Sequence, residues 1–320
     1  MTCRLFIENP PPFKQAHRGK DGTLVDVALA EGVTAAQLYL GAGLSLAGLH
    51  HSDLDRYESR RIRGEGMPDR HDSFAYVHAL KERVGPIEGL LIPHRVTVYR
   101  TVKDQTDDFR KLVQAGIGDI VLVGRPYSVP PAGTVYQSTV EEGLAFLSRH
   151  LADLGFNLGV IGIHTRAGEV DRIVRKFEAA GGRLRVMGQF LDDIDALTSF
   201  MDRLVQVFES RRLDLGRIEW NVGLAIFALK TRTFYAKLLR QDRLACEDRF
   251  VDLKSMEMRI AASIDMNVEF AYRAKEYGLH RGIDIGFSIQ PLIERDPSGA
   301  IHPAVHGAIS MARRLQRDLA

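Results

Sequence analysis

Short apolar runs alternate with amphipathic segments of helical length along most of the chain. Eight runs have the length and composition of strands, at residues 5–8, 37–40, 90–99, 119–123, 158–163, 184–190, 217–222 and 283–289. Between them, apolar residues recur every three or four positions, as in a helix laid on a core, at residues 140–151, 170–177, 194–208 and 305–315. Eight strands with interposed helices predict a (β/α)8 TIM barrel.

A doubly wound sheet is the alternative fold, because it has the same alternation of strands and helices. Its dinucleotide fingerprint fails here, since the Gly-Ala-Gly at 41–43 is followed by Leu-Ser-Leu and the third glycine of GxGxxG is missing. The sequence therefore predicts one barrel domain over residues 1–320. Residues 46–72 are predicted to form a loop or lid insertion, and residues 227–278 to hold two or three extra helices after strand seven.

Composition narrows the setting in which the protein works. The formal net charge of +2 gives no reason to expect a nucleic acid or an anionic membrane as a partner. The two cysteines, Cys3 and Cys246, form no CxxC pair, and the N-terminus lacks the plan of a signal peptide. No apolar run approaches the roughly 18–20 residues of a membrane span. We expect a soluble, cytoplasmic protein that acts on a small molecule.

The oligomeric state is left open by the sequence. Phe227, Phe234 and Tyr235 lie near the helices expected after strand seven and could form the interface of a homo-oligomer. Packing in the core is the commoner role of such residues and is the favoured interpretation.

A carboxylate ends the first predicted strand. Arg4-Leu5-Phe6-Ile7-Glu8-Asn9 runs directly into three prolines, which lack the N–H group that a strand ladder needs. Glu8 therefore lies at the C-terminal end of a strand, where barrels place their catalytic groups. The alternative is a structural partner in a salt bridge.

Polar residues also end or follow other predicted strands, and on a barrel they would converge on one mouth. A buried glutamine such as Gln189 needs partners or a ligand, and its adjacent donor and acceptor suit the edge of a heterocycle. His164 and Arg166 would face the mouth together, or belong to the loop before a helix. Apart from Glu8, the predicted ring contains Asn9, Tyr39, His94, Arg125, His164, Gln189, Asn221 and Gln290.

Motifs of several other enzyme classes are missing from the sequence. There is no GxSxG elbow for acyl transfer and no GxxxxGK[ST] loop for a nucleotide. The His-His-Ser-Asp-Leu-Asp cluster at 50–55 contains residue types that bind metals. Consecutive residues rarely direct their side chains to one point, so a solvated loop is the favoured interpretation and no metal site is predicted.

The order of these motifs resembles that of the methylenetetrahydrofolate reductases, whose catalytic domain is a (β/α)8 barrel. In that family the first strand carries a glutamate before two prolines, the second ends in Gly-Ala and the third carries Pro-His. The fourth ends in glycine before a proline loop. An Arg-Lys, acidic-Ala, Gly pattern precedes the sixth strand, which ends in Gln-Phe-x-x-Asp. The matching segments are collinear in this chain, at residues 6–11, 40–42, 92–94, 120–124 with 130–133, 175–181 and 189–193.

Departures from the family pattern fall on the flavin contacts. The family's fourth strand normally ends Leu-Arg-Gly-Asp, whereas residues 122–125 read Leu-Val-Gly-Arg. The threonine before Gly-Ala is replaced near residues 39–40, and the Tyr-Pro-Glu after strand five is replaced by Ile-His-Thr at 163–165. Because Glu8 and Gln189 remain, the chain is more similar to members of the family that work without flavin.

The resemblance implies an oxidoreductase that interconverts 5,10-methylenetetrahydrofolate and 5-methyltetrahydrofolate by direct hydride transfer with NADH or NADPH, without FAD. Glu8 would be catalytic, delivering a proton to the departing nitrogen or stabilising the cation that forms. The implied substrate-binding residues are Gln189, Phe190, Arg125 and Gln290, and the implied cofactor-binding residues are His94, Tyr39, His164 and Arg166. An FAD-containing reductase, and a folate-binding or methyl-transfer barrel without redox activity, are the alternatives.

Two assignments stay open within this scheme. Arg125, His164 and Arg166 would bind either the cofactor diphosphate or the folate glutamate tail, since arginine's planar guanidinium suits both anions. His94 would either contact the cofactor or orient Glu8.

Overall fold

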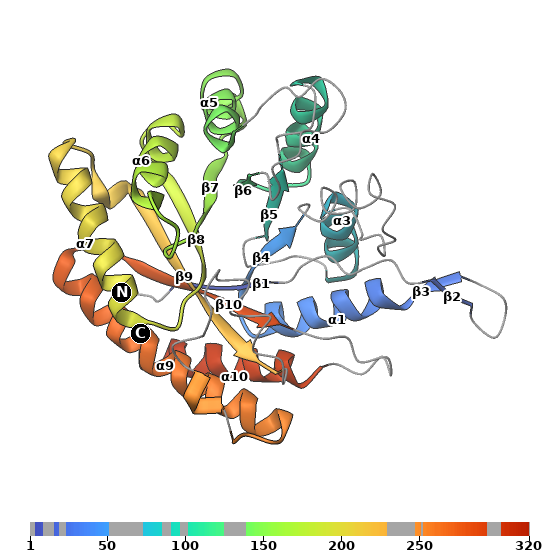
Figure 1. Ribbon diagram of the computed structural model, residues 1–320. Coiled ribbons are helices and arrows are strands. Elements are labelled where there is room, and N and C mark those ends of the chain that lie inside the picture. Colours follow the sequence, from blue (N-terminus) through green and yellow to red (C-terminus); the bar gives the residue numbers. More distant parts are fainter. Residues whose placement is uncertain are drawn as a thin grey trace, which may run out of the picture.

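The computed structural model describes residues 4–8, 16–18, 24–50, 73–84, 91–96, 102–124, 139–228, 247–250, 252–292 and 302–319. Eight parallel strands close into a barrel in the order β1-β10-β9-β8-β7-β6-β5-β4, with helices around it (Figure 1). This is the (β/α)8 TIM barrel predicted from the sequence. The barrel strands are β1 (Leu5–Glu8), β4 (Ser45–His50), β5 (Leu91–Val96), β6 (Asp119–Val123), β7 (Asn157–Gly162), β8 (Leu184–Phe190), β9 (Ile218–Phe227) and β10 (Ile285–Leu292).

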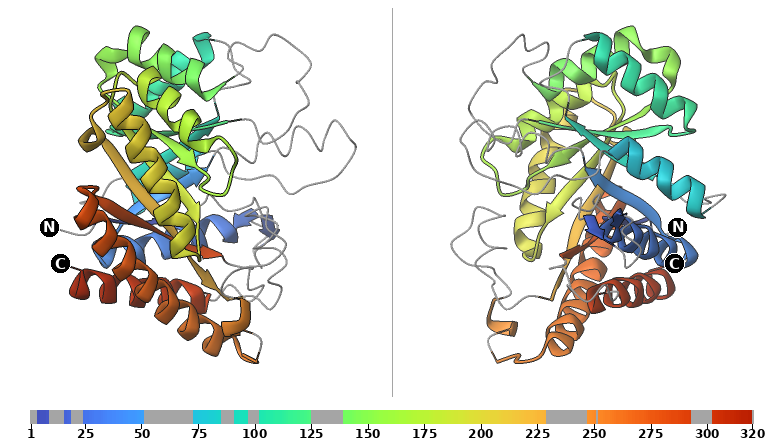
Figure 2. Two further views of the ribbon diagram at one scale, coloured as in Figure 1. Left: turned by 60° about the vertical axis from the view of Figure 1, so that its left-hand side comes forward. Right: turned by 90° about the vertical axis from the view of Figure 1, so that its right-hand side faces the viewer.

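Helices pack on the outside of the strands, and α9 and α10 lie side by side (Figure 2). A two-stranded antiparallel sheet of β2 (Ala16–Arg18) and β3 (Leu24–Asp26) precedes the first helix. The α-helices are α1 (Val27–Gly41), α3 (Ser73–Val84), α4 (Val102–Gln114), α5 (Val140–His150), α6 (Glu169–Ala179), α7 (Ile194–Ser210), α9 (Met256–Arg281) and α10 (Pro303–Asp318). Short 3-10 turns are η1 (Ala152–Leu154), η2 (Leu215–Arg217) and η3 (Glu247–Phe250).

Helix α7 illustrates how the sequence specifies these elements. The Asp193 carboxylate caps its first turn and accepts hydrogen bonds from the backbone N–H groups of Asp195 at 2.9 Å and Ala196 at 3.2 Å. Its apolar residues recur on one face, where Leu197 and Met201 are fully buried against the barrel. The four segments with this periodicity form α5, α6, α7 and α10, as predicted.

The strand predicted at residues 37–40 is wrong, because these residues lie in helix α1. Val33, Ala36 and Tyr39 are buried at spacings of three residues, which is the pattern of a helix. The second barrel strand is instead β4, which follows a turn at Gly43 with a positive φ of 73°. A short apolar run alone does not distinguish a strand from part of a buried helix.

Side chains alternate between the inside and the outside of the barrel along each strand. The inner layer is a small apolar cluster of Phe6, Ala47, Ile92, Val121 and Met187. The neighbouring strand residues face outward into a much larger core shared with the helices. This alternation determines which polar residues near the strand ends face the barrel axis.

The segment after β9 and the predicted lid are described only in part. Within the described residues, η3 and α9 follow β9, which fits the extra helices expected there. Residues 45–50 form strand β4, so the first five residues of the predicted lid at 46–72 lie in the barrel wall. The remaining residues of that lid, 51–72, lie outside the described part of the chain. No described helix is both long and apolar enough to cross a membrane.

Candidate active site

Glu8 ends strand β1 and faces the barrel axis, two residues after Phe6 of the inner layer. Its side chain is partly buried, and its Oε1 atom accepts a hydrogen bond of 2.9 Å from Nε2 of Gln290 on β10. Burial disfavours the carboxylate and raises the pKa of Glu8 to about 7, although the Gln290 bond acts in the opposite direction. A carboxyl group with this pKa can both release and accept a proton at neutral pH.

Gln290 is positioned by close packing between strands. It is 7 % exposed and lies on the inner face of β10, between the outward-facing Ile289 and the strand's end. A Cβ atom on Gly223 of β9 would come within 2.9 Å of the Gln290 Nε2 atom and 2.5 Å of the Phe190 backbone nitrogen. Glycine at 223 therefore leaves the space in which the Gln290 amide lies.

Gln189 is the last residue but one of β8, two residues after the inward-facing Met187. Its Oε1 atom is buried, and no described residue donates a hydrogen bond to it. The structure thus brings Gln189, Gln290 and Glu8 to the C-terminal mouth of the barrel. An unpaired carbonyl oxygen and a titratable carboxyl group suit a ligand that presents N–H groups and exchanges a proton.

Two more inward-facing polar groups lie below this level. The Oδ1 atom of Asn221 on β9 and the Oγ atom of Ser288 on β10 are buried without a hydrogen-bond partner among the described residues. Their strand neighbours belong to the outer core, which places both side chains inside the barrel. Asn221 was in the predicted ring. Gly223 and Ser288 were missed, although a glycine within an apolar strand is a known sign of close approach.

His164 lies outside the barrel rather than at its mouth. It packs edge-on against Phe200 and Trp220, with ring centroids 5.2 and 5.3 Å away, and its Nε2 atom accepts a hydrogen bond of 3.2 Å from the Trp220 indole nitrogen. Burial lowers the pKa of His164 to about 4, so the ring is neutral at neutral pH. A neutral imidazole in an aromatic cluster does not offer the positive charge that the predicted diphosphate contact requires.

Arg166 and Tyr39 also make contacts other than the predicted ones. Arg166 forms an ion pair with the buried Glu169, and the distance from its Nε to Glu169 Oε2 is 2.6 Å. Tyr39 lies on helix α1 in the outer core rather than at a strand end, which corrects the position expected for it. Burial raises the pKa of Tyr39. Neither placement favours the predicted contact with a cofactor.

The other predicted residues differ in their placement. Phe190 is buried and stacks edge-on with Phe227 at a centroid distance of 5.1 Å, after a shift in the register of β8, and its contact with substrate stays a prediction. The buried Phe227 thus packs in the core rather than at an interface. His94 is buried on the inner face of β5, two residues after Ile92. Arg125, Phe234 and Tyr235 lie outside the described residues.

The opposite end of the barrel contains an ion-pair network. Arg185 on β8 is bonded through Nη1 to Asp119 on β6 and through Nε to Glu219 on β9, the latter at 2.7 Å. These residues start their strands, so the network forms the floor of the barrel. The Arg185 guanidinium also lies 5.5 Å from the centroid of the Phe6 ring.

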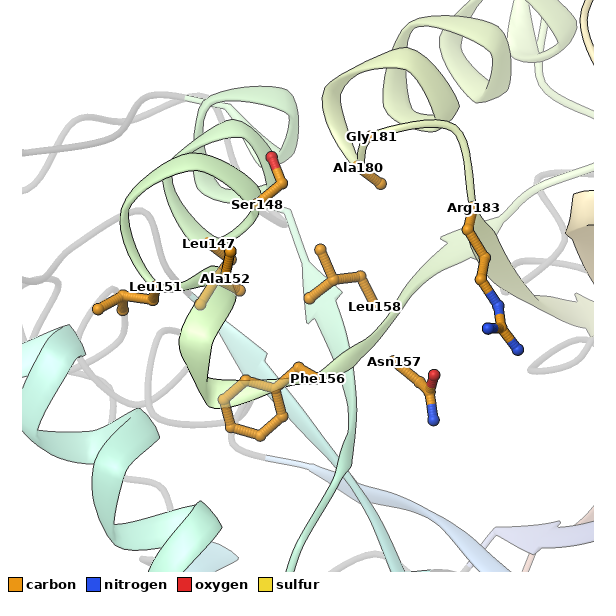
Figure 3. Close-up of a pocket in the computed structure, with 10 residues that line it drawn as sticks. All are labelled: Leu147, Ser148, Leu151, Ala152, Phe156, Asn157, Leu158, Ala180, Gly181 and Arg183. Carbon is orange, nitrogen blue, oxygen red and sulfur yellow. The ribbon is translucent and has the colours of Figure 1, made fainter.

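A pocket of about 230 Å³ lies at this same N-terminal end, between α5 and the start of β7 (Figure 3). Its lining mixes apolar side chains, such as Leu147 and Phe156, with the polar Asn157 and Arg183. The Ser148 hydroxyl in this lining donates a hydrogen bond of 2.8 Å to the carbonyl of Ala179. Because Asn157 starts β7, the pocket is at the opposite end of the barrel from Glu8. Among the described residues, no group of three metal-ligating side chains occurs.

Solved structures with a similar fold include several barrels. An uncharacterized protein from Clostridium thermocellum that binds two copies of 5-methyl-5,6,7,8-tetrahydrofolic acid is 14% identical, with 99% of this chain and 96% of that chain covered at a TM-score of 0.67. Dihydropteroate synthase from Xanthomonas albilineans is 13% identical, with 98% and 93% covered and a TM-score of 0.45. DHDPS from Cyanidioschyzon merolae is 14% identical, with 98% of each chain covered and a TM-score of 0.41.

At these identities the likeness shows the fold alone. No protein-family model matches the chain, and no curated protein matches its sequence.

Proposed function

We propose that this protein binds a tetrahydrofolate derivative in the barrel mouth and interconverts 5,10-methylenetetrahydrofolate and 5-methyltetrahydrofolate by hydride transfer with NADH or NADPH. The observation that carries the proposal is the Glu8 carboxyl group, which Gln290 holds at the barrel mouth and whose pKa is raised to about 7. Gln189, near the end of β8, adds a buried amide oxygen that no described residue pairs. The sequence resemblance to methylenetetrahydrofolate reductases supports the reaction. The fold likeness to a protein that binds 5-methyltetrahydrofolic acid supports the ligand class.

Glu8 supplies the proton that the reaction needs. Opening the methylene bridge moves the electron pair of its C–N10 bond onto N10, which then takes the proton from the protonated Glu8. The O–H bond of Glu8 breaks as the N–H bond forms, leaving a carboxylate close to the N5-iminium cation. General acid catalysis of this kind typically contributes about 10²–10⁴-fold to the rate.

Gln189 orients the substrate in this scheme. Its buried Oε1 atom can accept a hydrogen bond from an N–H group on the edge of the pterin, and a partner there would satisfy an otherwise unpaired acceptor. A fixed pterin edge holds the reacting atoms in position, which lowers the entropic part of the barrier.

The described residues do not fit the predicted dinucleotide site well. His164 is neutral and buried outside the barrel, and Arg166 is paired with Glu169, so neither supplies a placed charge for a diphosphate. FAD therefore has no part in the proposed reaction. The nicotinamide, as the second substrate, would supply the hydride to the one-carbon unit.

The alternative is a folate-binding barrel without redox activity. The placement of His164 and Arg166 supports it, because His164 packs in an aromatic cluster and Arg166 is paired with Glu169, so neither offers a free positive charge to a cofactor. In that case Gln189 and Glu8 would bind the reduced folate, and no nicotinamide would be consumed.

The test is turnover in the absence of added flavin. Purified protein is mixed with methylenetetrahydrofolate and NADH or NADPH, and absorbance at the nicotinamide band is followed. We expect oxidation of one of the two nicotinamides, and a loss of roughly 10²-fold or more in kcat in Glu8→Gln with folate affinity nearly unchanged. Glu209→Gln, at an exposed position at the end of α7, is the matched control and should retain the full rate.

The possible results separate the two candidates. Folate binding without nicotinamide oxidation would favour the non-redox barrel. Wild-type turnover in Glu8→Gln would remove Glu8 from the mechanism. Absence of both binding and turnover would overturn the proposed function.

A further inference from the structure

The two oxygens of the Glu8 carboxyl group differ in their surroundings. Oε1 accepts the 2.9 Å hydrogen bond from Gln290 Nε2, and no described residue is bonded to Oε2. Glu8 and Gln290 are 282 residues apart in sequence but lie on adjacent strands, since β1 pairs directly with β10. The closure of the barrel therefore brings this pair together.

The position of the Gln290 amide is determined by three strands. Gln290 lies on β10, which pairs with β9 along its whole length. In this register Gln290 is opposite Ala225, and Ser288, two residues earlier, is opposite Gly223. The missing side chain at Gly223 opens the space for the amide against the β8 backbone, where a Cβ would be 2.7 Å from the Gln189 carbonyl carbon. An amide confined in this way keeps its donor directed at Glu8.

We propose that Gln290 is a positioning residue, which holds Glu8 through Oε1 and leaves Oε2 as the oxygen that exchanges a proton with the ligand. The Gln290 donor bonds Oε1 in both protonation states, while the proton moves from Oε2 to the acceptor nitrogen. The identity of that acceptor rests on the proposed function, whereas the hold on Glu8 does not. Gln290 was expected from the sequence to bind substrate, so this gives it a different task.

Among the described residues, the hydrogen bond from Gln290 is the main polar influence on Glu8. In the wall, the β4 residue opposite Glu8 is Ala47, and the next inward polar group on β10 is the uncharged Ser288. His94 lies further round on β5, and the charged Arg185, Asp119 and Glu219 are at the far end of the barrel. A donor to the carboxylate stabilises the charged form, so removal of the Gln290 donor raises the pKa of Glu8.

The experiment measures the titration of Glu8 directly. The side-chain carboxyl carbons are observed by ¹³C NMR of the full-length protein between pH 4 and 10, and the Glu8 signal is assigned by its loss in Glu8→Gln. Gln290→Met keeps a similar length without a donor, and Gln290→Asn keeps the amide but is one methylene shorter. In both variants we expect the Glu8 midpoint to rise by about one pH unit from its wild-type value.

Ser288→Ala is the matched control, because it changes the preceding inward-facing residue of the same strand. It should leave the Glu8 midpoint in place. A midpoint that stays unchanged in both Gln290 variants, or that rises as much in Ser288→Ala, would overturn the assignment. If one Gln290 variant fails to fold, the other carries the test.

The pH dependence of turnover distinguishes this inference from the proposed function. In an active enzyme, the pKa in the kcat/KM profile should move with the NMR midpoint in the Gln290 variants. If the midpoint shifts in a protein that shows no turnover, the positioning role of Gln290 is supported and the proposed reaction is rejected. Normal turnover with an unmoved profile would reject the positioning role alone.

Discussion

The polar side chains at the two ends of the barrel interior differ in their hydrogen bonding. At the floor, Arg185 is bonded to both Asp119 and Glu219, so each charge has a partner. At the mouth, no described residue pairs the Gln189 acceptor, and Glu8 has a raised pKa and one amide donor among the described residues. Both ends are built on the same eight strands, and they differ in whether the described residues satisfy the polar groups.

This difference indicates what each end is for. Buried polar groups in proteins are nearly always paired, so a paired network needs no further explanation than the barrel's own structure. Unpaired groups at the C-terminal end of barrel strands lie where barrels bind their ligands. We interpret the floor as structural and the mouth as the place where a ligand completes the hydrogen bonding.

The largest effect is expected from breaking the floor. Arg185→Met leaves the buried Asp119 carboxylate without its partner, and we expect a loss of about 3–5 kcal/mol in the free energy of unfolding at pH 7. Denaturant unfolding measures it. Arg183→Met, at a largely exposed arginine 3.9 Å from Glu219, is the control and should change stability by less than about 0.5 kcal/mol. A loss below about 1 kcal/mol for Arg185→Met would contradict a structural floor.

Glu8→Gln should make the protein more stable at high pH, because burial of the Glu8 carboxylate removes it from water and destabilises the folded state. The native pKa of about 7 exceeds the ordinary value of 4.5, so between these pH values the folded state binds more protons and stability falls as pH rises. Glu8→Gln removes this fall. We expect a gain of about 1–3 kcal/mol at pH 8 and almost none at pH 4, by denaturant unfolding at both pH values. Equal effects at pH 4 and pH 8 would exclude a raised pKa.

His164 should show the opposite dependence on pH, because it is a buried base outside the barrel. Its native pKa of about 4 is below the ordinary 6.5, so between these values the unfolded state binds more protons and stability rises with pH. We expect His164→Phe to be about 1–2 kcal/mol less stable at pH 8, through loss of the Trp220 bond. The deficit should disappear by pH 4.5. A deficit that grows on acidification would mean that His164 is charged and paired in the native state.

The smallest effect is expected at Ser288, whose buried hydroxyl has no partner among the described residues. Ser288→Ala removes a polar group that the fold does not satisfy, so the free energy of unfolding should stay the same or increase by less than about 1 kcal/mol. Thermal unfolding at pH 7 is a sufficient measurement. A clear loss of stability would show that the hydroxyl is bonded, for instance through buried water.

Much of the fold was predictable from periodicity, and the exception has a physical cause. The strands predicted at 5–8, 119–123 and 184–190 agree with β1, β6 and β8 at both ends. The prediction for residues 37–40 failed because a run as short as Gln-Leu-Tyr-Leu fits a strand and a buried helix equally well. Only the preceding alanine-rich turns, which continue the same helical face, distinguish the two.

The site residues were predictable only where the alternation of inward-facing and outward-facing side chains along a strand could be assigned. Glu8 and Gln189 were found at the mouth because they are two residues along from inward-facing residues. The register of β8 shifts before Phe190, whose contact with substrate stays a prediction, and His164 follows an outward-facing Gly162 that packs against Val186 and Trp220. Neither the register shift in β8 nor the aromatic partners of His164 can be recognised from the neighbouring residues in the sequence.

The central claim is that a folate binds in the barrel mouth and pairs the polar groups that the described residues leave unpaired. Binding of 5-methyltetrahydrofolate is its most direct test. Calorimetric titration compares the wild type with Gln189→Leu, and with Asn157→Leu at the opposite end of the barrel as the control. We expect binding by the wild type, an affinity about tenfold lower for Gln189→Leu, and an unchanged affinity for Asn157→Leu. No binding by the wild type, or equal affinities for the wild type and Gln189→Leu, would contradict the claim.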